Sequence, residues 1–76
     1  MTLQEAITAS QAKDVYLSVG HNGVVRDVVP YEIKQGKFWL FCLNHYSTES
    51  WWLEDTSQWV VTDREIEWDM LPISGY

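Results

Sequence analysis

The feature that most restricts how this chain can fold is a series of short β-type segments separated by turn signals. Residues 15–19 (VYLSV) alternate in the manner of a half-buried strand. Asn22-Gly23 follows, and this pair predicts a hairpin because both residues accept the positive φ of a type I′ turn. Further segments of this kind lie at residues 24–33, 38–43, 50–54 and 59–63. The spacing predicts about five short strands in a small, strongly bent barrel.

A short helix is predicted before the first strand, over residues 2–12. Thr2 and Glu5 have the spacing of a capping box, and Leu3 and Ile7 form a narrow apolar stripe. A helix of this length is not stable alone, so we expect it to lie on the sheet. The chain is therefore predicted to be one mainly β domain, residues 1–76. It comprises the helix, a five-stranded barrel over residues 15–66 and an irregular tail over residues 67–76.

Within the predicted barrel, residues 38–43 (FWLFCL) are apolar on both faces, so this strand should be covered on both sides. Pro30 has no amide hydrogen, and we expect it at a sheet edge or a bulge. Trp39 and Trp51 are expected in the core. Trp52 must face away from its neighbour Trp51, because adjacent strand residues point to opposite sides.

The chain has 76 residues, and a core of this size is thin. Small domains compensate with disulfides, a metal or a partner. The single cysteine, Cys42, excludes an internal disulfide, and we expect no cysteine-based zinc site. His21 and His45 fall in predicted turns without a third ligand at a recognisable spacing, so we expect no metal and no cofactor. The chain would then compensate for its thin core by dense aromatic packing or by binding a partner, and its five tryptophans are consistent with either.

No run of residues has the length and apolar character of a membrane span, and the N-terminus does not resemble a signal peptide. A buried, reduced Cys42 would suit a cytoplasmic protein without a membrane partner. Catalysis is not expected either. Cys42 lies in an apolar strand, the serines lack a glycine elbow, and no glycine-rich phosphate loop is present.

The net charge of −6 is unevenly distributed along the chain. Residues 1–48 hold four acids and four bases, whereas residues 49–76 hold seven acids against Arg64 alone. An acidic half repels phosphate backbones, so direct nucleic-acid binding is disfavoured.

Three residue patterns resemble those of a known family. Arg26, Val28 and Pro30 repeat a family pattern of arginine, valine and proline at two-residue intervals. Trp39, Leu40 and Phe41 match, in altered order, a Trp-Tyr-Leu strand after a glycine turn. Over residues 3 to about 66 the chain thus resembles the WYL domain, a small SH3-like barrel usually appended to winged-helix bacterial transcription regulators. The resemblance implies an SH3-like barrel and a role in regulation. We expect a stand-alone module, because 76 residues leave no room for a winged helix.

The third pattern departs from the family in its charge. A later WYL strand usually reads Arg-x-Phe-x-Leu-x-Arg, with arginines thought to grip nucleic-acid or nucleotide ligands. The aligned arginine positions here are Glu49 and Asp55, while Trp51 and Leu53 retain the apolar framework. The family's usual ligand is therefore not expected to bind here.

The sequence favours a non-enzymatic regulatory module that binds a protein partner, itself basic or nucleic-acid-binding, through an acidic, tryptophan-containing surface. The residues predicted to contact this partner are Glu49, Trp52, Glu54, Asp55 and Trp59. Three alternatives remain open. One is a WYL-like sensor of a nucleotide or single-stranded nucleic acid that uses Arg26, Trp51 and Trp52. Another is an acidic nucleic-acid mimic, such as a phage or mobile-element inhibitor of a basic host protein. The last is a homo-oligomer joined through edge strands.

Overall fold

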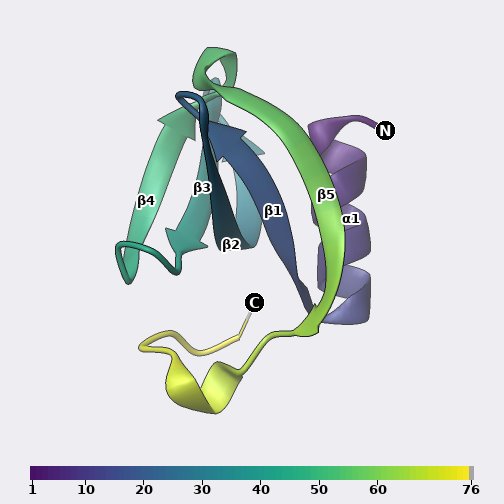
Figure 1. The fold of residues 1–76 in the computed structure, drawn as a ribbon, viewed down its shortest axis with the longest axis vertical. Helices are drawn as coiled ribbons and strands as arrows, with labels where there is room; N and C mark the ends of the chain where they lie inside the picture. Colours follow the sequence, from purple (N-terminus) through teal and green to yellow (C-terminus); the bar gives the residue numbers. More distant parts are fainter. Residues whose placement is uncertain (76) are drawn as a thin grey trace.

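The computed structural model describes residues 1–75 as one α-helix packed on a single antiparallel sheet (Figure 1). The elements are α1 (Leu3–Lys13), β1 (Val15–His21), β2 (Val24–Lys34), β3 (Lys37–Cys42), β4 (Ser47–Trp52) and β5 (Thr56–Glu65), with short 3₁₀ helices η1 (Leu53–Asp55) and η2 (Trp68–Met70). The five strands lie in the order β4-β3-β2-β1-β5. The prediction of a mainly β fold with an N-terminal helix is confirmed.

The helix forms for the local reasons that the sequence indicated. The Glu5 amide donates to Thr2 Oγ1 at 3.1 Å, and the Thr2 amide donates to Glu5 Oε1 at 2.8 Å, which completes the capping box. The helix ends at Asp14, whose φ of 58° is left-handed. Ser10 is fully buried, and its hydroxyl donates to the Val15 carbonyl at 2.5 Å. This bond fixes the end of the helix to the start of β1.

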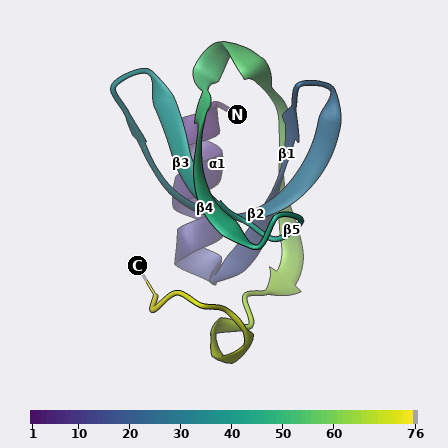
Figure 2. The same ribbon diagram turned by 90° about the vertical axis from the view of Figure 1, so that its left-hand side faces the viewer.

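The hairpins also follow the local signals. Asn22 and Gly23 have φ values of 51° and 80°, as the predicted turn requires. Pro30 does not lie at an edge, because β2 is an inner strand, but the pairing register shifts between Pro30 and Glu32. Such a bulge bends a strand. Figure 2 shows β2 running from one side of the molecule to the other, with its two hairpins on opposite sides.

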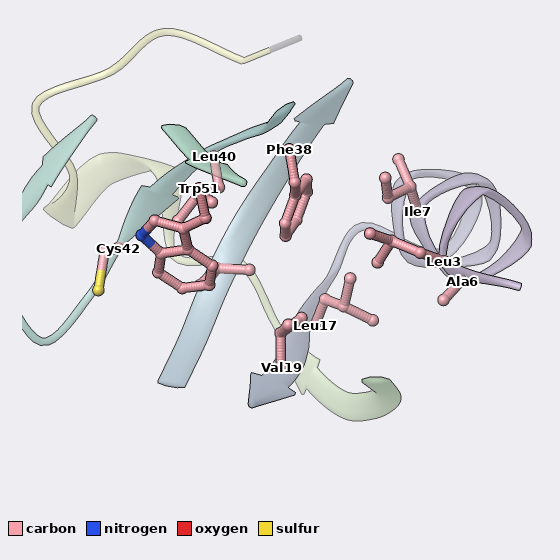
Figure 3. Packing of buried hydrophobic residues seen from close by; sticks show 10 residues of the cluster. Leu3, Ala6, Ile7, Leu17, Val19, Phe38, Leu40, Cys42 and Trp51 are labelled. Carbon is pink, nitrogen blue, oxygen red and sulfur yellow. The ribbon is translucent and has the colours of Figure 1, made fainter. Parts of the chain in front are cut away.

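The bent sheet encloses the main core, which α1 covers (Figure 3). Apolar residues of the helix stripe meet residues from the inner faces of the strands; the core comprises Leu3, Ala6, Ile7, Leu17, Val19, Val28, Phe38, Leu40, Cys42 and Trp51. The two edge strands, β4 and β5, are joined by η1, and over residues 1–75 they do not pair with each other. Over these residues the sheet therefore has two unpaired edges, and it is strongly bent (Figure 2).

A second, smaller core lies on the outer face, under the chain that follows β5. Its buried members are Tyr16, Val29, Phe41 and Ile66. The predicted tail begins with Glu67 and carries Trp68, Leu71 and Ile73 onto this core; Tyr76, its last residue, lies outside the described residues. The tail thus covers Phe41 but leaves Trp39, two residues earlier on the same face, 36% exposed. The prediction that Trp39 belongs to the core was wrong, because residues 67–75 cover only part of that face.

Several boundaries differ from the sequence prediction, and one of them is that β5 begins at Thr56 and not at residue 59. Residues 47–49 belong to β4 and not to the preceding loop, whereas residues 53–54 lie in η1 and not in a strand. Within residues 1–75 the longest helix is α1, whose 11 residues are too few to cross a membrane.

Candidate functional site

Strand β4 has two different faces because its side chains alternate. Ser47, Glu49 and Trp51 lie opposite Cys42, Leu40 and Phe38 of β3, so they share the inner face of the sheet. Thr48, Ser50 and Trp52 lie on the outer face. The consecutive tryptophans therefore have separate environments: Trp51 is 3% exposed, whereas Trp52 is 51% exposed.

On the inner face, Glu49 accepts hydrogen bonds from its neighbours. The Trp51 indole Nε1 donates to Oε1 at 3.0 Å and the Ser47 hydroxyl donates to Oε2 at 2.9 Å. Nδ1 of His45 lies 2.7 Å from Oε2. Partial burial acts to raise the pKa of Glu49, but the bonds from Trp51, His45 and Ser47 outweigh it and hold this pKa below its usual value. The carboxylate thus satisfies an indole N–H that burial would otherwise leave without a partner.

The ring of Trp51 is also covered. His21, at the end of β1, stacks on it with ring centroids 4.1 Å apart and planes 7° from parallel. Because β1 and β4 are not neighbours in the sheet, this contact spans the interior. Arg26 lies opposite Val19 on the same inner face of β1 and β2 and is partly buried. The structure does not place Trp51 and Trp52 on one platform, and a base could stack on Trp51 only after His21 had moved.

The residues expected to bind a partner also lie apart. Glu49 faces inward and Trp52 outward, while Glu54 and the partly buried Asp55 belong to η1. Trp59 is partly buried against the main core, and its Nε1 donates to the Met1 carbonyl at 2.8 Å. Of these five residues, Trp52 and Glu54 have exposed side chains.

A surface that sequence reasoning missed lies on the outer face of β3 and β4. Trp39 pairs with Ser50, and Lys37 pairs with Trp52, so the two tryptophans are diagonal neighbours. Lys37 Nζ lies 4.5 Å from the centroid of the Trp52 ring, in a cation–π contact. We call Lys37, Trp39, Ser50 and Trp52 the Trp39–Trp52 patch. Because side chains alternate along a strand, an inward-facing Phe38 implies that Lys37 and Trp39 face outward, and this alternation could have predicted the patch.

Three potential metal ligands come together where β3 turns into β4. One ligand atom each from Cys42, His45 and Glu49 lies within 4.8 Å of the other two, and in residues 1–75 this is the only such group of three. The sequence expectation of no metal site considered cysteines and histidines separately. The spacing Cys42-x₂-His45-x₃-Glu49 across a hairpin carried the missing signal.

Residues 1–75 form no pocket that could enclose a small molecule. Comparisons with family models, with curated proteins and with solved structures gave no significant match to this chain.

Proposed function

We propose that this chain is a non-enzymatic interaction module that binds a protein partner through the Trp39–Trp52 patch. The observation that carries this proposal is the exposure of two tryptophans side by side on one face of the sheet. Tryptophan is among the residues most enriched in interface hot spots, where it fills a pocket on the partner. Strand β4 lies at the edge of the sheet beside the patch, so a strand of the partner could also extend the sheet there.

The partner we propose is a basic protein with an arginine at the contact. The face of Trp52 already holds the ammonium of Lys37, and a guanidinium stacks on tryptophan in the same way. The chain's net charge of −6 would attract a basic partner over a distance. Exposed Glu54 follows the patch closely in the chain and could pair with the same partner.

We further propose that the sheet is an SH3-like barrel of the WYL type. The strand order β4-β3-β2-β1-β5 and the 3₁₀ helix η1 between β4 and β5 support it. Side-chain contact between β1 and β4, through His21 and Trp51, supports closure across the interior. On this reading the WYL arginine positions are taken by Glu49 and Asp55, and a regulatory role would be exerted through a protein and not through a bound nucleotide.

Substitution of Trp52 by alanine tests the proposed function. Partner proteins are first captured with wild-type protein, and their affinity for purified variants is then measured by calorimetry. We expect Trp52→Ala to weaken binding about 30-fold or more, the loss typical of a hot-spot residue. Val60→Ala is the matched control, because Val60 is 59% exposed on the outer face of β5. Equal affinities of wild type and Trp52→Ala for every captured partner would refute the proposal.

A further inference from the structure

We propose that Cys42, His45 and Glu49 bind a zinc ion at the β3–β4 hairpin, with a fourth position left for water or a partner side chain. This site is independent of the Trp39–Trp52 patch, because its residues belong to the inner face and to the loop.

The three side chains match what zinc prefers. Zinc binds cysteine sulfur, histidine nitrogen and carboxylate oxygen, and it accepts three protein ligands with a fourth position open. Tetrahedral zinc holds such atoms about 3.4–3.6 Å apart, as its bond lengths require. Here the ligand atoms lie within 4.8 Å of one another, so adjustments of roughly 1 Å would complete the geometry. Magnesium and calcium are disfavoured by the thiol and the imidazole.

The hairpin brings these residues together through strand pairing. Cys42 lies opposite Ser47, so Glu49 follows two residues later on the same inner face of β4. The intervening turn returns His45 to that face, where its Nδ1 lies 2.7 Å from Glu49 Oε2. Zinc would insert between these two atoms and replace their direct contact.

Contacts outside the ligand set position the turn. The Leu43 amide donates to the Asp27 carbonyl at 3.1 Å. Tyr46 adopts a left-handed φ of 53°, and its ring packs edge-on against Phe41 with ring centroids 5.5 Å apart. The Tyr46 hydroxyl donates a hydrogen bond to the Met70 carbonyl. His45 is therefore held next to Glu49 by the strands and the tail, before any ion binds.

A neighbouring bond orients the carboxylate toward the ion. Trp51 Nε1 donates to Oε1 of Glu49, and Oε2 is the oxygen nearer His45. Partners of this kind fix a ligand's orientation and raise metal affinity. The His45 side chain is 52% exposed, so an ion can reach the site from solvent, while the buried Cys42 would close it from the core side.

A metal ion at this site would also compensate for the small hydrophobic core of a 76-residue chain. The ion would join β3, β4 and their turn, in a fold that has no disulfide. Metal binding that requires the folded arrangement stabilises that arrangement directly.

The first experiment is a cobalt(II) titration of purified, tag-free, reduced protein, followed by zinc displacement and by competition with a chromophoric chelator. We expect one ion per chain, a thiolate-to-cobalt charge-transfer band, and a zinc Kd below about 1 μM, in the range of protein zinc sites. Zinc at 100 times its Kd should raise the Tm by about 10–20 °C. Absence of the thiolate band, or a zinc Kd above about 1 μM, would overturn the proposal by leaving only adventitious binding.

Variants then assign the ligands. His45→Gln should weaken zinc binding about 100-fold or more while leaving the metal-free fold intact, because His45 is exposed. Glu49→Gln should also weaken it, and Cys42→Ser should abolish the cobalt band. Glu54→Gln is the matched control, the same substitution at an exposed acid outside the ligand set, and should bind zinc as wild type does. If Cys42→Ser fails to fold, His45→Gln decides: an affinity within threefold of wild type contradicts the site.

Discussion

Leu40 offers the sharpest test of how this fold is stabilised. Its side chain is fully buried in the main core, in the middle of β3. The strand is paired on both sides at this point, with Pro30 of β2 and Glu49 of β4. A cavity left by Leu40→Ala would therefore be walled by backbone that cannot easily move inward.

The expected loss follows from that rigidity. Leucine-to-alanine changes in cores cost about 2–5 kcal/mol, and the cost is greatest where the surroundings cannot collapse. For Leu40→Ala we expect about 3–5 kcal/mol. Leu3→Ala makes the same chemical change at the start of α1, where the residue is also buried but the helix can shift. There we expect about 2 kcal/mol.

Stability is measured by urea unfolding, monitored by tryptophan fluorescence and far-UV circular dichroism. A domain of 76 residues has about 4–11 kcal/mol in total, so at the lower end of this range Leu40→Ala would be largely unfolded, and at the upper end it would fold with a clearly lower urea midpoint. Val60→Ala, on the exposed surface, should change stability by less than about 0.5 kcal/mol. A loss below about 1 kcal/mol for Leu40→Ala, or a larger loss for Leu3→Ala, would refute the argument from backbone rigidity.

Three further predictions follow from particular contacts. Gly20→Ala should destabilise the protein by about 1–3 kcal/mol in urea unfolding, because an added Cβ would lie 2.8 Å from the Ser57 carbonyl oxygen; an unchanged midpoint would contradict this. The hydrogen bond from the Thr2 backbone amide lowers the pKa of Glu5. The stabilisation of the fold by the ionised Glu5 carboxylate is therefore fully present above pH 4.5 and is lost as the pH falls through the lowered pKa. Glu5→Gln should show a smaller fall in Tm with acid than wild type, and parallel curves would count against the capping role. Cys42 in metal-free native protein should react with a thiol reagent far more slowly than in urea, since it is buried; equal rates would argue against the burial of β3.

The sequence predicted the parts of the fold that depend on neighbouring residues. The Thr2–Glu5 capping box and the Asn22-Gly23 turn each act over a few residues, and both are present. Alternation over residues 15–19 predicted a strand, and Leu17 and Val19 of β1 do share the main core, because a strand's period does not depend on its partners.

What the sequence missed depends on distant parts of the chain. Trp39 is exposed because, within residues 67–75, the tail packs on the core around Phe41, and nothing near Trp39 in the sequence encodes that limit. The contact between His45 and Glu49 depends on which residues of β3 and β4 pair, since a shift of one residue would send Glu49 to the outer face. A site formed by pairing register is visible only when the register is known.

The acids around the tandem tryptophans therefore have unrelated roles. Glu49 lies two residues before Trp51 in β4 and therefore shares its inner face. There its carboxylate accepts a hydrogen bond from the buried indole N–H, which needs an acceptor. Asp55 belongs to the connection that joins the two edges of the sheet, where its carbonyl accepts the Asn22 amide at 3.0 Å. Reversing the charge of Glu49 would remove support from a buried ring as well as change the surface field. A test of electrostatic partner recognition is cleaner at Glu54, which is exposed and has no such structural bond among the contacts of residues 1–75.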